Sequence, residues 1–237
     1  MKGTIKKLIK KLPFAFTLNQ KYDRQTVRVI KKTCNSRSNC IDVGCHKGEI
    51  LDYIKAVAPE GKHYGFEPIP ELFEKLKIKY QATNCTIYPL AISNKKEKVS
   101  FNYVISNPSY SGLKKRKYDR PHETDRQIDV ETDTLDNIIP QHIKIDFIKI
   151  DVEGAEILVL EGAKRLIKKD HPVIVFEYGI GGSDLYEPNP EKIFNLLNTH
   201  GLKISLIERW LKNIGPLNLS EFKEQYYKKL NFFFIAY

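Results

Sequence analysis

The sequence alternates short apolar runs with helix-forming segments, and this alternation constrains the fold more than any other feature. Strands are expected at 40–44, 62–66, 85–88, 146–150, 172–176, 203–207 and 232–236, and helices at 49–58, 70–80, 155–169 and 191–200. Short strands separated by helices of about 10–15 residues indicate βαβ units. The sequence therefore predicts an α/β fold around a mostly parallel, seven-stranded sheet.

Two further strand-like runs, 99–104 and 127–131, interrupt this alternation. The residues between them are polar and include Pro, Gly and Ser, which is typical of a long loop. We therefore expect a hairpin inserted into the main fold. Gly201 follows the helix at 191–200 and is expected to close it.

The positive charge is confined to the beginning of the chain. Residues 1–40 contain eleven Lys or Arg and one Asp, which accounts for the whole net charge of +10. An enzyme acting on nucleic acid would more often carry its positive charge around the active cleft. We therefore expect no nucleic-acid partner, and we divide the chain into a basic, helical N-terminal extension (1–39) and one main domain (40–237).

Within the extension, Ile5, Leu8, Ile9 and Leu12 repeat with helical spacing between lysines, and Pro13 ends the pattern. Residues 1–12 could make a peripheral contact with anionic lipid. Alternatively, this apolar stripe could pack on the domain or on a partner subunit.

The rest of the composition predicts a cytoplasmic protein, which could also contact the inner surface of the membrane. The chain has no apolar stretch of roughly 20 residues and lacks the apolar region of a secretory signal. Its four cysteines, at positions 34, 40, 45 and 85, have no zinc-ligand spacing, so we expect free thiols.

The segment Asp42–Gly48 lies between the first strand and the first helix of the domain. Gly44 permits a tight turn and close approach of a ligand, and Gly48 permits the helix to start close to the sheet. Two glycines do not make the three-glycine dinucleotide fingerprint, and Asp42 would repel a diphosphate. The turn suits a cationic group, such as the amino group of a methionine moiety.

A second acidic residue supports a nucleoside ligand. Glu67 ends the second strand, 25 positions after Asp42. An acid at this place can accept both ribose hydroxyls, and ligands in open α/β sheets lie at the carboxyl ends of the strands. The pair fits an adenosine without a 2′-phosphate. On these residues alone two alternatives stay open: a binding site for NAD, and a turn with a purely structural role.

The run KIDVEGAE at 149–156 resembles the signature of the FkbM family of methyltransferases. Four other stretches fall in that family's order: IDVGCHKG at 41–48, FEPIPELFEKL at 66–76, YPLAISNKKEKVSF at 88–101 and ETDTLDNII at 131–139. The resemblance covers residues 40 to about 178. It implies a Rossmann-like class I methyltransferase fold with an N-terminal helical extension, S-adenosylmethionine as methyl donor, and O-methylation of a sugar or another metabolite.

The resemblance also implies roles for individual residues. It places Glu67 at the donor ribose, and Ala91 and Ile92 at the adenine edge. The residues of the donor loop are Asp42, Gly44, Cys45, His46 and Gly48, and Asp151 follows the motif strand. The chain departs from the family at three loop positions, where Cys45 replaces Ala, His46 replaces Asn and Lys47 replaces a small or apolar residue.

O-methylation requires an aligned acceptor and a base for its hydroxyl proton. Asp151 and Glu177 each follow a predicted strand, so both should point into one crevice. We expect Asp151 and Glu153 to orient or deprotonate the acceptor and Glu177 to contact it. Glu153 could instead be an acid favoured at a helix N-terminus. We see no second ligand set and expect no required metal.

Two other functions are considered. The run FNYVISNPSY at 101–110 is similar to the Asn-Pro-Pro-Tyr motif of amino-group methyltransferases, which would make Asn107-Pro108 an N-methylating site. Ser109 replaces the second Pro, and the ten or so residues before Val99 leave no room for the helix that such enzymes place there. A loop over the active site, bordering a small-molecule or glycan acceptor, is therefore favoured. The third possibility is a non-catalytic domain that binds adenosyl ligands.

Overall fold

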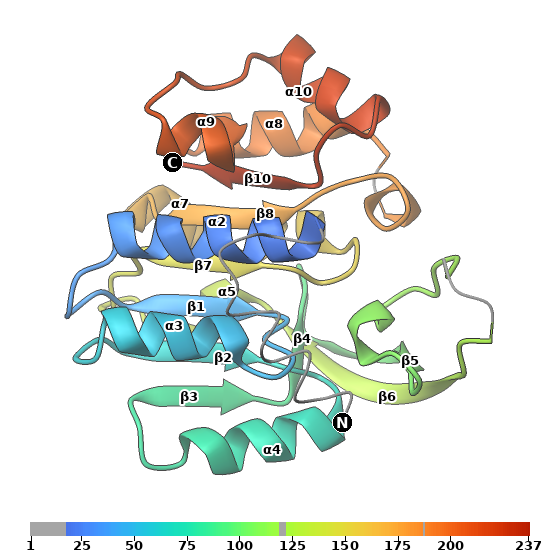
Figure 1. Cartoon of the computed structure of the whole chain (residues 1–237). Helices are drawn as coiled ribbons and strands as arrows, with labels where there is room; N and C mark the ends of the chain where they lie inside the picture. The colour runs from blue at the N-terminus through green and yellow to red at the C-terminus, as the bar shows by residue number, and fades with distance from the viewer. Residues whose placement is uncertain (1–17, 119–121, 187) are drawn as a thin grey trace.

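The computed structural model describes residues 18–118, 122–186 and 188–237, so the helix predicted for 1–12 lies outside the described residues. A seven-stranded sheet forms the centre, in the order β3-β2-β1-β7-β8-β10-β9 (Figure 1). The strands are β1 (Cys40–Val43), β2 (His63–Phe66), β3 (Cys85–Tyr88), β7 (Phe147–Ile150), β8 (Val173–Glu177), β9 (Ile204–Leu206) and β10 (Phe233–Ala236). β10 is antiparallel to both neighbours and the other pairs are parallel. The predicted fold class is confirmed.

Helices cover both faces of the sheet. One face carries α2 (Leu18–Thr33), α3 (Glu49–Val57), α4 (Pro70–Tyr80) and α9 (Ile207–Leu211), and the other carries α5 (Leu135–Ile138), α6 (Glu156–Glu161), α7 (Lys164–Asp170), α8 (Pro190–Thr199) and α10 (Leu219–Tyr227). Alternate strand residues serve the two layers. Phe147 packs with Val29 and Ile30 of α2, whereas Ile148 and Ile150 pack with the helices of the opposite face.

α2 is the first described element and packs tightly on the sheet. Val29 and Ile30 are fully buried, and the Tyr22 ring stacks on Phe233 of β10 with centroids 4.9 Å apart. Among the described residues, no helix is both long enough and apolar enough to cross a membrane.

The helix predicted for 155–169 is wrong as a single element, because it is divided into α6 and α7. The division falls at Gly162, where a Cβ atom would lie 2.1 Å from the Ser93 carbonyl oxygen. The Gly162 carbonyl also accepts the Asp136 backbone N–H at 3.0 Å. Tight packing against the segment after β4 (Leu90–Ile92) thus interrupts the helix. Gly201 follows α8 with a φ of +87°, which confirms its predicted place at the helix end.

A second sheet of three strands stands at the edge of the main one (Figure 1). β5 (Glu97–Val104) and β6 (Asp125–Asp133) form the predicted hairpin, and β4, absent from the prediction, pairs parallel with β6. The predicted loop between them contains one short 3₁₀ helix, η1 (Pro108–Tyr110), and a second one, η2 (Ser183–Leu185), follows β8.

α9 and α10, which lie between β9 and β10, are also absent from the prediction. α10 is held against the sheet by Phe222, which is fully buried and lies 4.9 Å from the Phe234 ring and 6.0 Å from the Tyr178 ring. An Asn218–Glu221 capping box starts the helix.

We expect Phe222→Ala to lower the free energy of unfolding by about 3–5 kcal/mol, because it removes a buried ring and leaves a cavity. Tyr227→Ala on the same helix removes a ring that is 56% exposed and should cost less than about 1 kcal/mol. Urea denaturation measures both values. Equal losses in the two variants would contradict this placement of α10.

Candidate active site

The carboxyl ends of β1, β2, β7 and β8 open into one cavity of about 270 Å³. Acidic side chains from each of these strand ends line it: Asp42, Glu67, Asp151 and Glu177. A parallel sheet brings such residues to the same edge although they are far apart in the sequence. The cavity is thus the meeting point that the sequence predicts.

Most of the predicted site residues come together here. The cavity is lined by Asp42, Gly44, Cys45, His46, Glu67, Ala91, Ile92, Asp151, Glu153 and Glu177. Gly48 does not line it. A Cβ atom on Gly48 would lie 2.6 Å from the Tyr80 hydroxyl, so this glycine permits α3 to begin against α4.

Gly44 fixes the turn after β1 against the end of β7. Its φ is +76°, and a Cβ atom would lie 1.9 Å from the Asp151 carbonyl oxygen. The backbone N–H groups of Gly44 and Cys45 both donate to the Phe66 carbonyl at 3.1 Å. The glycine is therefore required by protein packing, in addition to any approach of a ligand.

Glu67 is almost fully buried beside this turn. One carboxylate oxygen accepts the His46 N–H at 2.8 Å, and the other accepts the Ile69 N–H at 3.0 Å. His46 reaches that position with a left-handed φ of +49°. Burial raises the pKa of Glu67 to about 7, although both amide hydrogen bonds oppose the shift. Each oxygen keeps a lone pair that a ligand hydroxyl can use.

Asp42 is 1% exposed, and neither of its carboxylate oxygens accepts a hydrogen bond from the described residues. Lys149 Nζ lies 3.7 Å from Asp42 Oδ1. Burial raises the pKa of Asp42 to about 6, while Lys149 opposes the shift. A buried acceptor without a donor is costly. A ligand that brings ammonium or hydroxyl donors into the cavity would therefore fit this residue.

Lys149 is a residue of the cavity that the sequence analysis quoted only as part of a motif. It is 8% exposed, and its Nζ lies 3.2 Å from Asp151 Oδ2 and donates to the Gly44 carbonyl at 3.3 Å. Burial disfavours its charge, but Asp151 and Asp42 together raise the pKa of Lys149 above its usual value. The signal was present, because a lysine within the buried run DFIKI requires a partner.

Asp151 and Glu177 share a hydrogen bond at the strand ends. Burial and then the neighbouring Asp151 raise the pKa of Glu177 well above its usual value. Burial also favours protonation of Asp151, but Lys149 and the hydrogen bond from Glu177 outweigh it and lower the pKa of Asp151. The two shifts have opposite directions, so of this pair Glu177 keeps its proton to the higher pH.

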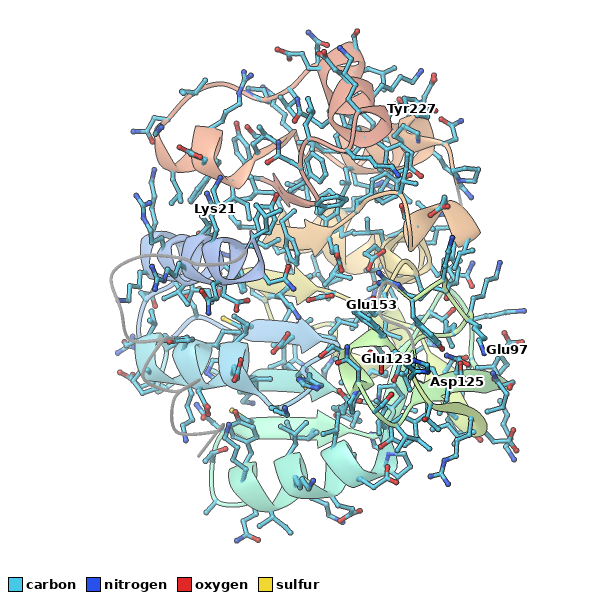
Figure 2. All side chains as sticks on the ribbon, turned by 45° about the vertical axis from the view of Figure 1, so that its right-hand side comes forward. Lys21, Glu97, Glu123, Asp125, Glu153 and Tyr227 are labelled. Atoms are coloured by element: carbon cyan, nitrogen blue, oxygen red, sulfur yellow. The ribbon has the colours of Figure 1, made fainter. Side chains whose placement is uncertain are left out.

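Glu153 completes a group of three carboxylates. One oxygen each from Asp151, Glu153 and Glu177 lie within 4.8 Å of one another. Glu153 has a left-handed φ of +56° and forms an ion pair with Arg116. Burial, followed by Asp151, raises the pKa of Glu153 to about 8 against the effect of Arg116. Figure 2 shows Glu153 between the strand ends and the small sheet.

This spacing could hold a metal ion, although Lys149 and Arg116 already pair with two of the three acids. That no metal is required stays a prediction. Glu156, by contrast, has a structural role. It is fully buried and accepts the backbone N–H groups of Val152 and Gly154, which holds the turn between β7 and α6.

The segment after β5 covers the cavity. Its residues Pro108, Ser109, Ser111 and Leu113 line the wall, whereas Asn107 is not part of it. Arg116 attaches the segment to Glu153, and Lys114 attaches it to the Leu185 carbonyl, to which it donates at 2.7 Å. Within the segment, Arg116 lies 5.0 Å from the Tyr110 ring centroid. The cover was predicted, but these contacts were not.

One solved structure with a TM-score above 0.5 supports the fold. A methyltransferase FkbM from Methylobacillus flagellatus KT is 16% identical with a TM-score of 0.53, over 86% of this chain and 44% of that protein. This chain therefore corresponds to less than half of that enzyme's length. A precorrin-6y C5,15-methyltransferase from Geobacter metallireducens GS-15 is 14% identical (TM-score 0.45), over 81% of this chain and 79% of the other.

A TehB-like methyltransferase from Corynebacterium glutamicum is 13% identical with a TM-score of 0.45, over 90% of this chain and 85% of the other. No curated protein matches the sequence. The profile of the methyltransferase FkbM domain matches residues 42–204, which include the turn after β1, the small sheet and the three-carboxylate group. The chain therefore belongs to the FkbM family of methyltransferases, which take their methyl group from S-adenosylmethionine.

Proposed function

We propose that this protein is an S-adenosylmethionine-dependent O-methyltransferase acting on a hydroxyl group of a sugar, glycan or related metabolite. The observation that carries the proposal is the cavity itself. It joins Asp42, a buried carboxylate that accepts no hydrogen bond from the described residues, to a second acidic group, the hydrogen-bonded pair of Asp151 and Glu177. The first group suits a cationic donor, and the second suits an acceptor that must lose a proton.

Asp42, Gly44, Cys45, His46, Glu67, Ala91 and Ile92 would hold the donor. Asp42 would accept the amino group of its methionine end, and Glu67 would accept the ribose hydroxyls with the lone pairs that the backbone leaves available. When bound, S-adenosylmethionine supplies an electrophilic methyl group on a sulfonium. The surrounding carboxylates favour such a positive charge.

On the acceptor side, Asp151 and Glu177 would hydrogen-bond the acceptor and orient its hydroxyl. Glu153 would remove the hydroxyl proton, because its pKa of about 8 makes its ionised form a stronger base than Asp151, whose pKa is lowered. The covering segment with Arg116 would keep water out and hold Glu153 in place.

Three features outside the cavity complete the proposal. The acceptor would be a small molecule or glycan rather than nucleic acid, the protein would work in the cytoplasm, and residues 1–12 would allow peripheral contact with the inner membrane surface. The excess positive charge in residues 1–40 supports the last of these.

We expect the protein to bind S-adenosylhomocysteine and Asp42→Asn to weaken that binding by about 10–100-fold, because hydrogen bonds to a charged group are worth about 1.5–3 kcal/mol. Isothermal titration measures the affinity. Asp129→Asn, in the small sheet and outside the cavity lining, is a matched control and should change nothing. Absence of binding by the unaltered protein would remove the enzymatic proposal.

We expect Asp151→Asn to reduce turnover by at least about 100-fold, since it removes the group that orients the acceptor. Asn107→Ala should stay within about threefold of the unaltered enzyme, because Asn107 does not line the cavity. The assay is transfer of a labelled methyl group to a panel of hydroxyl-bearing and amine-bearing sugars. The opposite pattern, with methylated amines, would show an N-methyltransferase.

The raised pKa of Glu153 predicts a pH dependence. A carboxyl group accepts a proton only when it is ionised, so kcat/KM should increase as pH rises through about 8. Glu153→Gln should leave a low activity without that rise. A wild-type kcat/KM that does not change between about pH 6 and 9 would exclude Glu153 as the base.

A further inference from the structure

The outer side of α2 carries a continuous basic stripe. At about 100° per residue, five cations fall within roughly 100° of the helix circumference. They are Lys21, Arg24, Arg28, Lys31 and Lys32, and all but the partly exposed Arg24 are exposed. The buried side chains of the helix, such as Val29 and Ile30, fall on the other side and pack on the sheet. The stripe is therefore the polar face of an amphipathic helix.

The stripe continues into a groove between α2 and α9. Lys21, Arg24, Arg28 and Lys212 line this groove, which has a volume of about 290 Å³. Glu208 is the acidic residue among those that line the groove, and it forms ion pairs with Lys212 at 2.8 Å and with Lys21 at 3.7 Å. Figure 2 shows Lys21 on the side of α2 that faces α9. The groove keeps a surplus of positive charge, which suits phosphate groups.

Apolar residues stand at both ends of this basic surface. Leu18, at the start of α2, is 59% exposed. Ile214 is 46% exposed. It follows Asn213, whose side-chain oxygen accepts a hydrogen bond from Lys32 Nζ at 2.7 Å. Five more lysines precede α2 in the sequence, interleaved with Ile5, Leu8, Ile9 and Leu12. Apolar side chains between cations fit a lipid surface, whereas the phosphate backbone of a nucleic acid uses only the cations.

We propose that the α2–α9 face, with its basic stripe and groove, docks this protein onto a membrane rich in anionic phospholipid. The cations attract the lipid phosphates, and Leu18 and Ile214 enter the headgroup region. The catalytic cavity lies on the other flank of α2, where Asn19, Asp23 and Thr26 line it. Docking therefore leaves the cavity open, and the inference does not depend on the proposed reaction.

The test is co-sedimentation of the full chain with vesicles of phosphatidylcholine, alone or with about 30% phosphatidylglycerol. We expect binding only to the anionic vesicles and a loss of binding at high salt. The variant Arg28→Glu/Lys31→Glu should bind at least about tenfold more weakly, because each basic residue near an anionic surface contributes about a fivefold factor. Arg28→Gln/Lys31→Gln should show a smaller loss in the same direction.

The matched control is Lys164→Glu/Lys168→Glu, which changes the net charge equally on α7, at the opposite face of the sheet. It should stay within about twofold of the unaltered protein. S-adenosylhomocysteine binding should be unchanged in every variant, which separates a failed docking surface from a failed donor site. Equal losses in both Glu variants, no preference for anionic vesicles, or binding of an RNA oligomer in place of vesicles would overturn the proposal.

Discussion

The site depends on Lys149, which holds two carboxylates together across neighbouring strands. Its ammonium lies between Asp42 of β1 and Asp151 after β7, and it also donates to the Gly44 carbonyl. Without this internal cation, the buried Asp42 and the partly buried Asp151 would face each other at the sheet edge at an electrostatic cost. Gly44 permits the same close approach, since any side chain there would collide with the Asp151 carbonyl. One lysine and one glycine therefore hold the carboxyl ends of β1 and β7 close together at the cavity.

The fold could be predicted because burial on both faces makes parallel strands apolar throughout, and such runs are visible in the sequence. The convergence of Asp42, Glu67, Asp151 and Glu177 on one cavity could be predicted because the carboxyl ends of parallel strands meet at one edge of a sheet. The contact between Arg116 and Glu153 could not be predicted, since the two residues are 37 positions apart and meet only in the folded chain. The division of α6 from α7 was equally hidden, because it falls at Gly162, which packs too closely on the distant Ser93 for a side chain and whose carbonyl accepts the Asp136 N–H. α10 has a signal that is readable in the sequence, the Asn218–Glu221 capping box at its start.

The two flanks of α2 have different chemistry, although both belong to one helix. Asp23 lines the catalytic cavity on one flank, and Lys21, Arg24 and Arg28 line the groove on the other. The apolar side between them packs against the sheet. A change in the basic stripe should therefore leave the residues that line the cavity in place.

The central claim is that a cationic methyl donor lies across the strand ends, and a crystal structure with S-adenosylhomocysteine tests it most directly. The account predicts the amino group of the ligand beside Asp42 and both ribose hydroxyls on Glu67, with the adenine edge near Ala91 and Ile92. A ligand bound elsewhere, or a diphosphate found in this cavity in its place, would contradict the account.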